Sequence, residues 1–120
     1  MRATAPPRLV VAALALILSG CGGSKGASAT PVGTCLNDGG FLVQQRQQVV
    51  DGMSPGGVNF TLTLYKDAAA ARARAAGKDP TTTAVLENGV VDFGGNPGRA
   101  RMSKADLAAI RSCLSRADRG

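Results

Sequence analysis

The chain has 120 residues, with 14 lysines and arginines against 8 aspartates and glutamates, which gives a formal net charge of +6. It contains no histidine, no tryptophan, three phenylalanines and one tyrosine. This composition argues against histidine-assisted nucleophilic catalysis, a histidine-ligated zinc site and an aromatic platform for nucleic acid. The length predicts one small domain with a thin core.

An export signal is predicted over residues 1–20. Arg2 and Arg8 give a positive start, and Leu9–Leu18 is an unbroken apolar run. As a helix, this run would rise about 15 Å, half of a hydrocarbon core that is about 30 Å thick. The segment is therefore predicted to be a processing signal rather than a membrane span.

The residues Leu18, Ser19, Gly20 and Cys21 end this signal. In that setting they resemble the lipobox of bacterial lipoproteins. The resemblance implies a diacylglyceryl thioether on Cys21 and cleavage between Gly20 and Cys21. Two acyl chains are enough to hold a small protein on a membrane. The alternative is a plain secretory signal in which Cys21 is incidental.

The segment after Cys21 is rich in glycine, serine and alanine, and we expect it to be a flexible linker. The predicted organisation is a signal peptide over 1–20, the lipidated cysteine and linker over 21–33, and one domain over 34–120. Without Arg2 and Arg8, 12 basic and 8 acidic residues remain, so the net charge falls to +4.

With Cys21 lipidated, Cys35 and Cys113 are the only possible intramolecular pair. Disulfides persist in exported proteins, and small domains commonly depend on them. A bond between these cysteines would close most of the domain into one loop, worth about 4 to 5 kcal/mol in chain-entropy models. A catalytic thiol is less well supported, because the chain has no histidine to activate it.

Alternating apolar and polar residues predict a strand over Val58–Tyr65. A weaker strand begins at Phe41–Val43 and could continue through the polar residues 44–48 to Val49 and Val50. The turn-rich segment Asp51–Gly57 separates the two runs. We therefore expect a hairpin with a longer loop.

An alanine-rich helix is predicted over Ala68–Ala76, capped by Asp67 and ended by Gly77 and Pro80. Asn88 and Gly89 are a typical two-residue hairpin turn. Counting outward from that turn pairs Leu86 with Val91 and Ala84 with Phe93.

Ser103 and Asp106 form a variant capping box at the start of a last helix. Its apolar stripe consists of Leu107, Ile110 and Leu114, with Cys113 on the flank of the stripe. The expected fold is α+β, a two-layer sandwich of a four-stranded sheet with both helices on one face, in the order ββαββα, with one disulfide.

The folded part also resembles small exported proteins and lipoproteins of actinobacteria that have no established function. The residues that carry this resemblance are Thr34-Cys35-Leu36, Asp51–Val58 with Phe60–Tyr65, Val90–Gly94 and Ile110–Leu114. The resemblance implies no functional residue within the domain.

Three groups of residues are candidate functional sites. Gly52-Met53-Ser54-Pro55-Gly56 has the spacing of a hydrolase nucleophile elbow, but a proline follows Ser54 and no histidine is present, so a turn is favoured. The glycine-rich segment Gly94–Arg99 lacks the lysine and hydroxyl residue of a phosphate-binding loop, so a surface loop is favoured. The scattered carboxylates support no metal site.

Two basic clusters are also candidate binding surfaces. They consist of Arg72, Arg74 and Lys78, and of Arg99, Arg101 and Lys104. They could contact anionic headgroups, but a solvated surface is favoured.

The sequence therefore predicts a lipoprotein anchored through Cys21 on the extracytoplasmic side of the cell membrane, with a binding or structural domain and an envelope protein as a partner. No catalytic residue, cofactor, metal or nucleic acid is expected. The alternatives are a small envelope hydrolase that uses Ser54 or the Gly94–Arg99 loop, and a peripheral module that binds anionic membranes.

Overall fold

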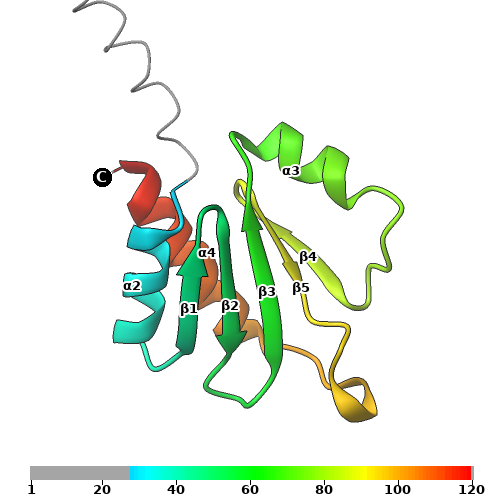
Figure 1. Ribbon diagram of the computed structural model, residues 1–120. Helices are drawn as coiled ribbons and strands as arrows, with labels where there is room; N and C mark the ends of the chain where they lie inside the picture. The colour runs from blue at the N-terminus through cyan, green and yellow to red at the C-terminus, as the bar shows by residue number, and fades with distance from the viewer. Residues whose placement is uncertain (1–27, 120) are drawn as a thin grey trace, which may run out of the picture.

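The computed structural model describes residues 28–119, in which three α-helices accompany a five-stranded antiparallel sheet of order β1-β2-β3-β5-β4 (Figure 1). The elements are α2 (Thr30–Asp38), β1 (Leu42–Arg46), β2 (Val49–Met53), β3 (Asn59–Leu64), α3 (Ala68–Ala75), β4 (Thr83–Leu86), β5 (Gly89–Asp92), the 3-10 turn η2 (Pro97–Arg99) and α4 (Lys104–Arg119). The predicted α+β class is confirmed. The predicted four strands and two helices are wrong, because one strand and one helix were missed.

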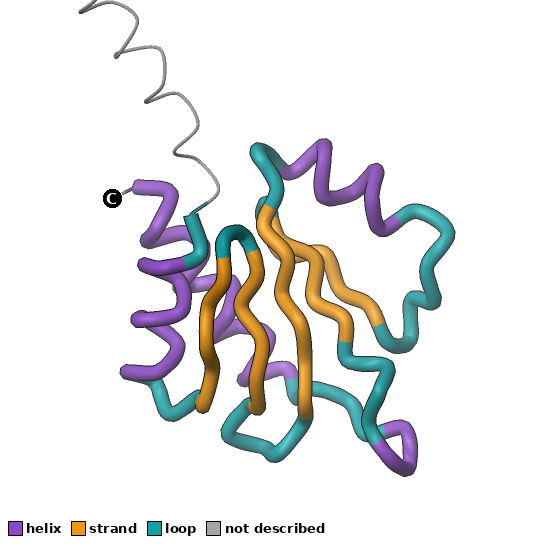
Figure 2. The backbone as a smooth tube through the Cα atoms, viewed as in Figure 1, coloured by secondary structure: helices purple, strands orange, loops and turns teal. Residues whose placement is uncertain are grey.

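The main core lies between the sheet and the pair α2 and α4, which pack against each other (Figure 2). The predicted stripe of α4 is confirmed, since Ile110 and Leu114 are buried. Val32 and Leu36 of α2, four residues apart, are buried in the same cluster. At the centre of the sheet's contribution, Val50, Leu62 and Val91 stand opposite one another on three neighbouring strands.

The helix α3 does not share the face of α4, so the prediction that both helices lie on one face is wrong. It packs on β4 and β5. Val90 of β5 is buried although it points away from Val91 and the main core, and neither Val90 nor the fully buried Ala71 belongs to that core. An alanine helix has no large apolar stripe, so it covers only this small patch on the opposite, outer face.

Local signals correctly predicted three elements. The strand β3 alternates between exposed and buried side chains, as its sequence pattern requires. Asp67 caps α3 by accepting a hydrogen bond from the Ala70 amide at 2.8 Å, and Ser103 accepts one from the Asp106 amide at 3.0 Å. The Asp106 carboxylate accepts a hydrogen bond from the Gly56 amide at 3.3 Å, so it links α4 to the loop before β3.

The first hairpin differs from the prediction. The chain turns at Gln47 and Gln48, and β2 extends into the segment that was read as a loop. Gln47 adopts a φ of 55°, which a glutamine seldom does, so no local turn signal marked the position. Gly52 lies within β2, close to the neighbouring strand. Glycine is needed at this position because a Cβ would clash with the Leu42 carbonyl oxygen.

The second hairpin turns at Glu87 and Asn88, one residue before the predicted position. As a result, Leu86 stands opposite Gly89, and Ala84 stands opposite Val91. Tertiary packing explains the shift, because a Cβ on Gly89 would lie 2.7 Å from Leu62 Cδ1. Gly89 is therefore used for close packing in the core, while the Asn88 side chain donates to the Tyr65 carbonyl at 2.9 Å.

The folded region starts earlier than the predicted boundary at residue 34. Ala29 and Val32 are each 1% exposed, and α2 begins at Thr30. Pro31 lies in the first turn of α2, where its missing N–H removes no helical hydrogen bond. Gly33 lets α2 approach β1, since a Cβ there would meet the Gln45 side chain.

The predicted disulfide between Cys35 and Cys113 is confirmed. It joins α2 to α4 across a sequence separation of 78 residues, with the two Cα atoms 5.7 Å apart. Cys113 is buried beside the core and Cys35 is half-buried. The bond therefore connects the first and last helices of the described fold.

Candidate functional site

A row of polar side chains crosses the whole outer face of the sheet. The strand register places one residue from every strand side by side, in the order Gln44, Asp51, Thr61, Asp92 and Thr83. Residues directly opposite one another in a sheet project from the same face. The outer face therefore presents carboxylates and hydroxyl groups, whereas the opposite face is apolar.

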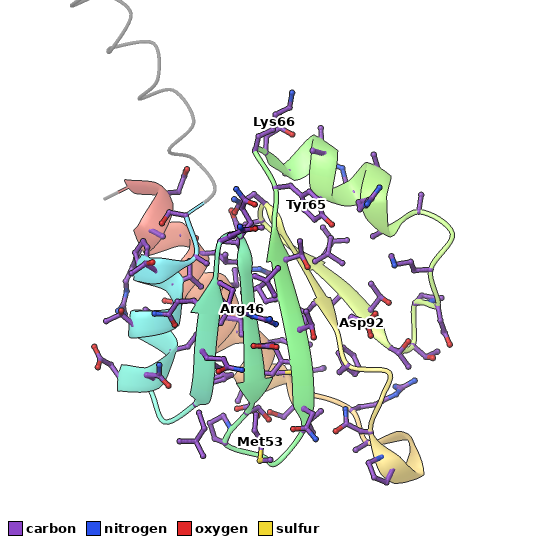
Figure 3. The ribbon with its side chains drawn as sticks, viewed as in Figure 1. Arg46, Met53, Tyr65, Lys66 and Asp92 are labelled. Atoms are coloured by element: carbon purple, nitrogen blue, oxygen red, sulfur yellow. A yellow bond between two sulfur atoms is a disulfide. The ribbon has the colours of Figure 1, made fainter. Side chains whose placement is uncertain are left out.

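A groove of about 370 Å³ lies over β3 and β5 on this face. Thr61 and Thr63 line it from β3, Asp92 lies opposite Thr61 on the neighbouring strand, and Tyr65 and Lys78 complete the polar lining. Figure 3 shows Tyr65 and Asp92 on the same side of the sheet, with Tyr65 close to α3. The remaining lining residues are Val90 and Gly95.

The groups in this groove both donate and accept hydrogen bonds. The hydroxyl groups of Thr61, Thr63 and Tyr65 do both, the Asp92 carboxylate accepts, and the Lys78 ammonium donates. Asp92 also accepts a hydrogen bond from the Gly94 amide through Oδ1 at 2.9 Å, which fixes its position. The arrangement is suited to a small polar molecule with several hydroxyl groups.

The outer face over β1 and β2 is different. Arg46 and Asp51 form an ion pair at 3.5 Å. Asp51 Oδ1 is buried and accepts no hydrogen bond within that part of the chain. Leu42 and Met53, which are opposite each other, are exposed large apolar side chains. An open hollow of about 340 Å³ on this half of the sheet is lined in part by Leu42, Gln44 and Asp51.

Ser54 lies in the loop between β2 and β3 and is 4% exposed. Its Oγ accepts a hydrogen bond from the Val58 amide at 3.2 Å, and its own amide donates to the Val58 carbonyl at 2.9 Å. Because the Ser54 hydroxyl group is buried and accepts a hydrogen bond from the backbone, its role in this structure is to hold the loop between β2 and β3 in shape.

The segment Gly94–Arg99 is held on β3 by one side chain. Asn96 accepts from the Asn59 amide and donates to the Asn59 carbonyl, both at 2.8 Å, and also donates to the Phe93 carbonyl. These bonds satisfy its amide group and fix the loop beside the strand. Gly95 of this segment lines the groove.

The two predicted basic clusters are not brought together. Arg72, Arg74 and Lys78 lie on α3 and the segment after it, whereas Arg101 and Lys104 lie at the start of α4, at the end of the sheet where β5 finishes (Figure 1). All five of these side chains are exposed. The chain enters the fold at the other end of the sheet, beside the last turn of α4.

Cys21, the signal peptide and most of the predicted linker lie outside the described residues. Over the range 28–119, no helix is long and apolar enough to cross a membrane. The same range contains no group of three histidine, cysteine, aspartate or glutamate residues placed to hold a metal ion.

No family model, no curated protein and no solved structure matches the chain. The resemblance to lipoproteins of actinobacteria stays a prediction that depends on the residues quoted for it.

The groove was not predicted as a site from the sequence. Alternation along Val58–Tyr65 had placed Thr61, Thr63 and Tyr65 on one face, and that signal was available. The sequence did not indicate which strand lies beside β3, because β5 pairs with β3 only after the chain has crossed over through α3 and β4.

Proposed function

We propose that this protein is a lipoprotein anchored at Cys21 on the extracytoplasmic side of a membrane, and that its domain binds a small polyhydroxylated ligand of the saccharide class. The observation that carries the proposal is the groove of hydroxyl groups, one carboxylate and one ammonium group on the outer sheet face. Ligand sites combine a preformed hollow with a few well-placed polar groups. An antiparallel sheet needs only one face for its core, so the other face is free for binding.

A saccharide suits this lining because each of its hydroxyl groups can donate one hydrogen bond and accept others. Asp92 would accept from ligand hydroxyl groups, Lys78 would donate to ligand oxygen atoms, and Thr61 and Thr63 would do either. The Tyr65 ring would supply an apolar surface at one end of the groove. The described lining residues hold one cation and one anion, so they do not require a charged ligand.

The anchor would keep this domain close to the membrane. Eight Cα-to-Cα steps separate Cys21 from Ala29, the first buried residue of the fold. Even a fully extended chain covers about 29 Å over that distance. The ligand would therefore be a component of the membrane surface or of the layer directly outside it.

Binding is tested by nuclear magnetic resonance titration of the protein with a panel of neutral, amino and acidic mono- and disaccharides. Thr63→Val keeps the shape of the side chain but removes its hydroxyl group, and Asp92→Asn keeps an oxygen for the Gly94 amide. We expect each change to weaken binding by about tenfold, the equivalent of one hydrogen bond. Gln44→Ala, on the same face outside the groove, serves as the control and should change affinity less than twofold.

The binding proposal fails if no saccharide in the panel shifts the amide signals of Thr61 and Thr63. It also fails if Gln44→Ala weakens binding as much as the two groove variants do, since the ligand would then lie elsewhere on the face.

The anchor is tested separately by mass spectrometry of the native protein. We expect an N-terminal Cys21 that carries a diacylglyceryl group, and we expect Cys21→Ser to move the protein from the membrane fraction to the soluble fraction. A mature protein with an unmodified Cys21 would contradict the anchor but leave the groove proposal standing.

A further inference from the structure

The two edges of the sheet are protected to different degrees. At the β1 edge, the Asn37 side chain donates to the Val43 carbonyl at 3.1 Å and accepts from the Val43 amide at 3.0 Å. Both backbone groups of Val43 that point away from β2 are therefore occupied, as an added strand would occupy them. Proteins use such coverage to prevent unwanted strand pairing.

The β4 edge has no such cover. The Phe93 amide donates to the Thr82 carbonyl at 2.9 Å, so Thr82 and Phe93 form a hydrogen-bonded pair. Pairs alternate in an antiparallel ladder, and the backbone groups of Thr83 and Val85 therefore point away from β5. Within residues 28–119, no hydrogen bond to these outward amide and carbonyl groups is present.

The composition of β4 does not protect this edge either. Its residues are Thr83, Ala84, Val85 and Leu86, without a charge or a proline, and its register with β5 continues without a bulge. Charged residues, prolines and bulges are the usual devices that blunt an edge strand. Figure 1 shows β4 as the last strand of the sheet, on the side of α3.

We propose that the β4 edge binds an extended acidic segment of a partner protein by strand addition. The main-chain groups of Thr83 and Val85 would pair with the segment, which is the mode of recognition in which backbone bonds supply affinity. This site uses the backbone of the β4 edge and does not depend on the groove over β3 and β5, although Lys78 lies beside both.

Cations outnumber carboxylates around β4 and favour an acidic partner, since the segment Lys66–Glu87 holds four basic residues against Asp67, Asp79 and Glu87. Arg72, Arg74 and Lys78 are exposed on α3 and the segment that leads into β4, and none of them forms an ion pair with another described residue. Acidic side chains that alternate along an added strand would project from the outer face beside these cations. Two copies of this chain joined through β4 would instead bring two cationic α3 segments onto one face, which like charge disfavours.

The test is fluorescence anisotropy of a labelled, end-blocked octapeptide of alternating glutamate and valine, titrated with the full-length protein in detergent. Val85→Pro removes the outward amide without removing a bond to β5, and we expect it to weaken binding by about tenfold or more. Val85→Ile keeps that amide and should change affinity less than twofold. A peptide with lysine in place of glutamate should bind at least about fivefold more weakly.

A second variant covers the case in which Val85→Pro impairs folding, which thermal melting would reveal. Arg72→Glu combined with Arg74→Glu alters only exposed side chains and should weaken binding by about fivefold. Its matched control is Lys104→Glu combined with Arg111→Glu, which changes the net charge equally on α4 and should leave affinity unchanged.

The inference is overturned if the glutamate peptide does not bind at about 1 mM, a concentration that would detect even weak association. It is also overturned if well-folded Val85→Pro protein binds as tightly as the unmodified protein, or if the α4 control weakens binding as much as the α3 variant. A dimer in the absence of peptide that Val85→Pro abolishes would assign the edge to a second copy of the chain instead.

Discussion

Replacing Cys35 and Cys113 together by alanine is expected to lower the free energy of unfolding by about 4 to 5 kcal/mol. The bond closes a loop with a sequence separation of 78 residues, and the chain-entropy model gives this value for a loop of that length. Domains of this size have a total stability of about 5 to 15 kcal/mol. The double variant should therefore be marginally folded or unfolded at ambient temperature.

Chemical denaturation followed by circular dichroism measures this effect. The unmodified protein treated with a reducing agent should show the same midpoint as the double alanine variant, because both lack the same bond. Cys21→Ser is the control and should unfold like the unmodified protein, since that residue precedes the described fold. A loss below about 1 kcal/mol would mean that the packing of α2 on α4 holds the domain without the bond.

Gly52→Ala should be the most damaging single substitution of a glycine in this domain. Its Cβ would clash with the Leu42 carbonyl oxygen and lie 2.7 Å from Val43 Cα, and both are backbone atoms of the adjacent strand. Side chains can rotate away from a new methyl group, but a strand must shift as a whole and lose its pairing. We expect a loss of about 3 kcal/mol, at the upper end for overpacking.

The matched control is Gly95→Ala, because a Cβ at that position has no neighbour within 4 Å. Its free energy of unfolding should change by less than about 0.5 kcal/mol. Urea denaturation of the two variants side by side provides the measurement. Equal stabilities would show that β1 and β2 can separate at Gly52 without cost, contrary to the contacts described above.

Short-range patterns predicted the parts of the fold that depend on neighbours in sequence. The alternation of β3, the cap at Asp67 and the stripe of α4 each follow from residues within two turns or a few strand positions of one another. The disulfide also followed, because exclusion of Cys21 left one possible pair. Predicting these features does not require the spatial positions of residues that are distant in sequence.

The errors concern residues whose conformation is determined by distant contacts. Gly89 is typical of a turn but packs between strand and helix, and Gln47 forms a turn that its type does not favour. The helix α2 contains a proline and a glycine within its first half, so its sequence resembles a linker. Its burial of Val32 and Leu36 depends on α4, which is more than 60 residues away in the chain.

The same limit applies to the groove. Its β3 residues could be placed on one face from their spacing, but Asp92 and Lys78 join them only through the crossover from β3 to β4. Strand order within a sheet is a long-range property, and alternation does not reveal it. The polar row across all five strands was therefore not predictable from the sequence.

The position of the disulfide has a consequence for biogenesis. Cys35 emerges from the ribosome, or from an export channel, well before its partner, since 78 positions separate the two cysteines. Until α4 has also emerged, the thiol of Cys35 cannot reach Cys113 and is open to cross-linking with a neighbouring nascent chain. Oxidation is therefore a late step in maturation, and products truncated before α4 should accumulate as covalent dimers in an oxidising compartment.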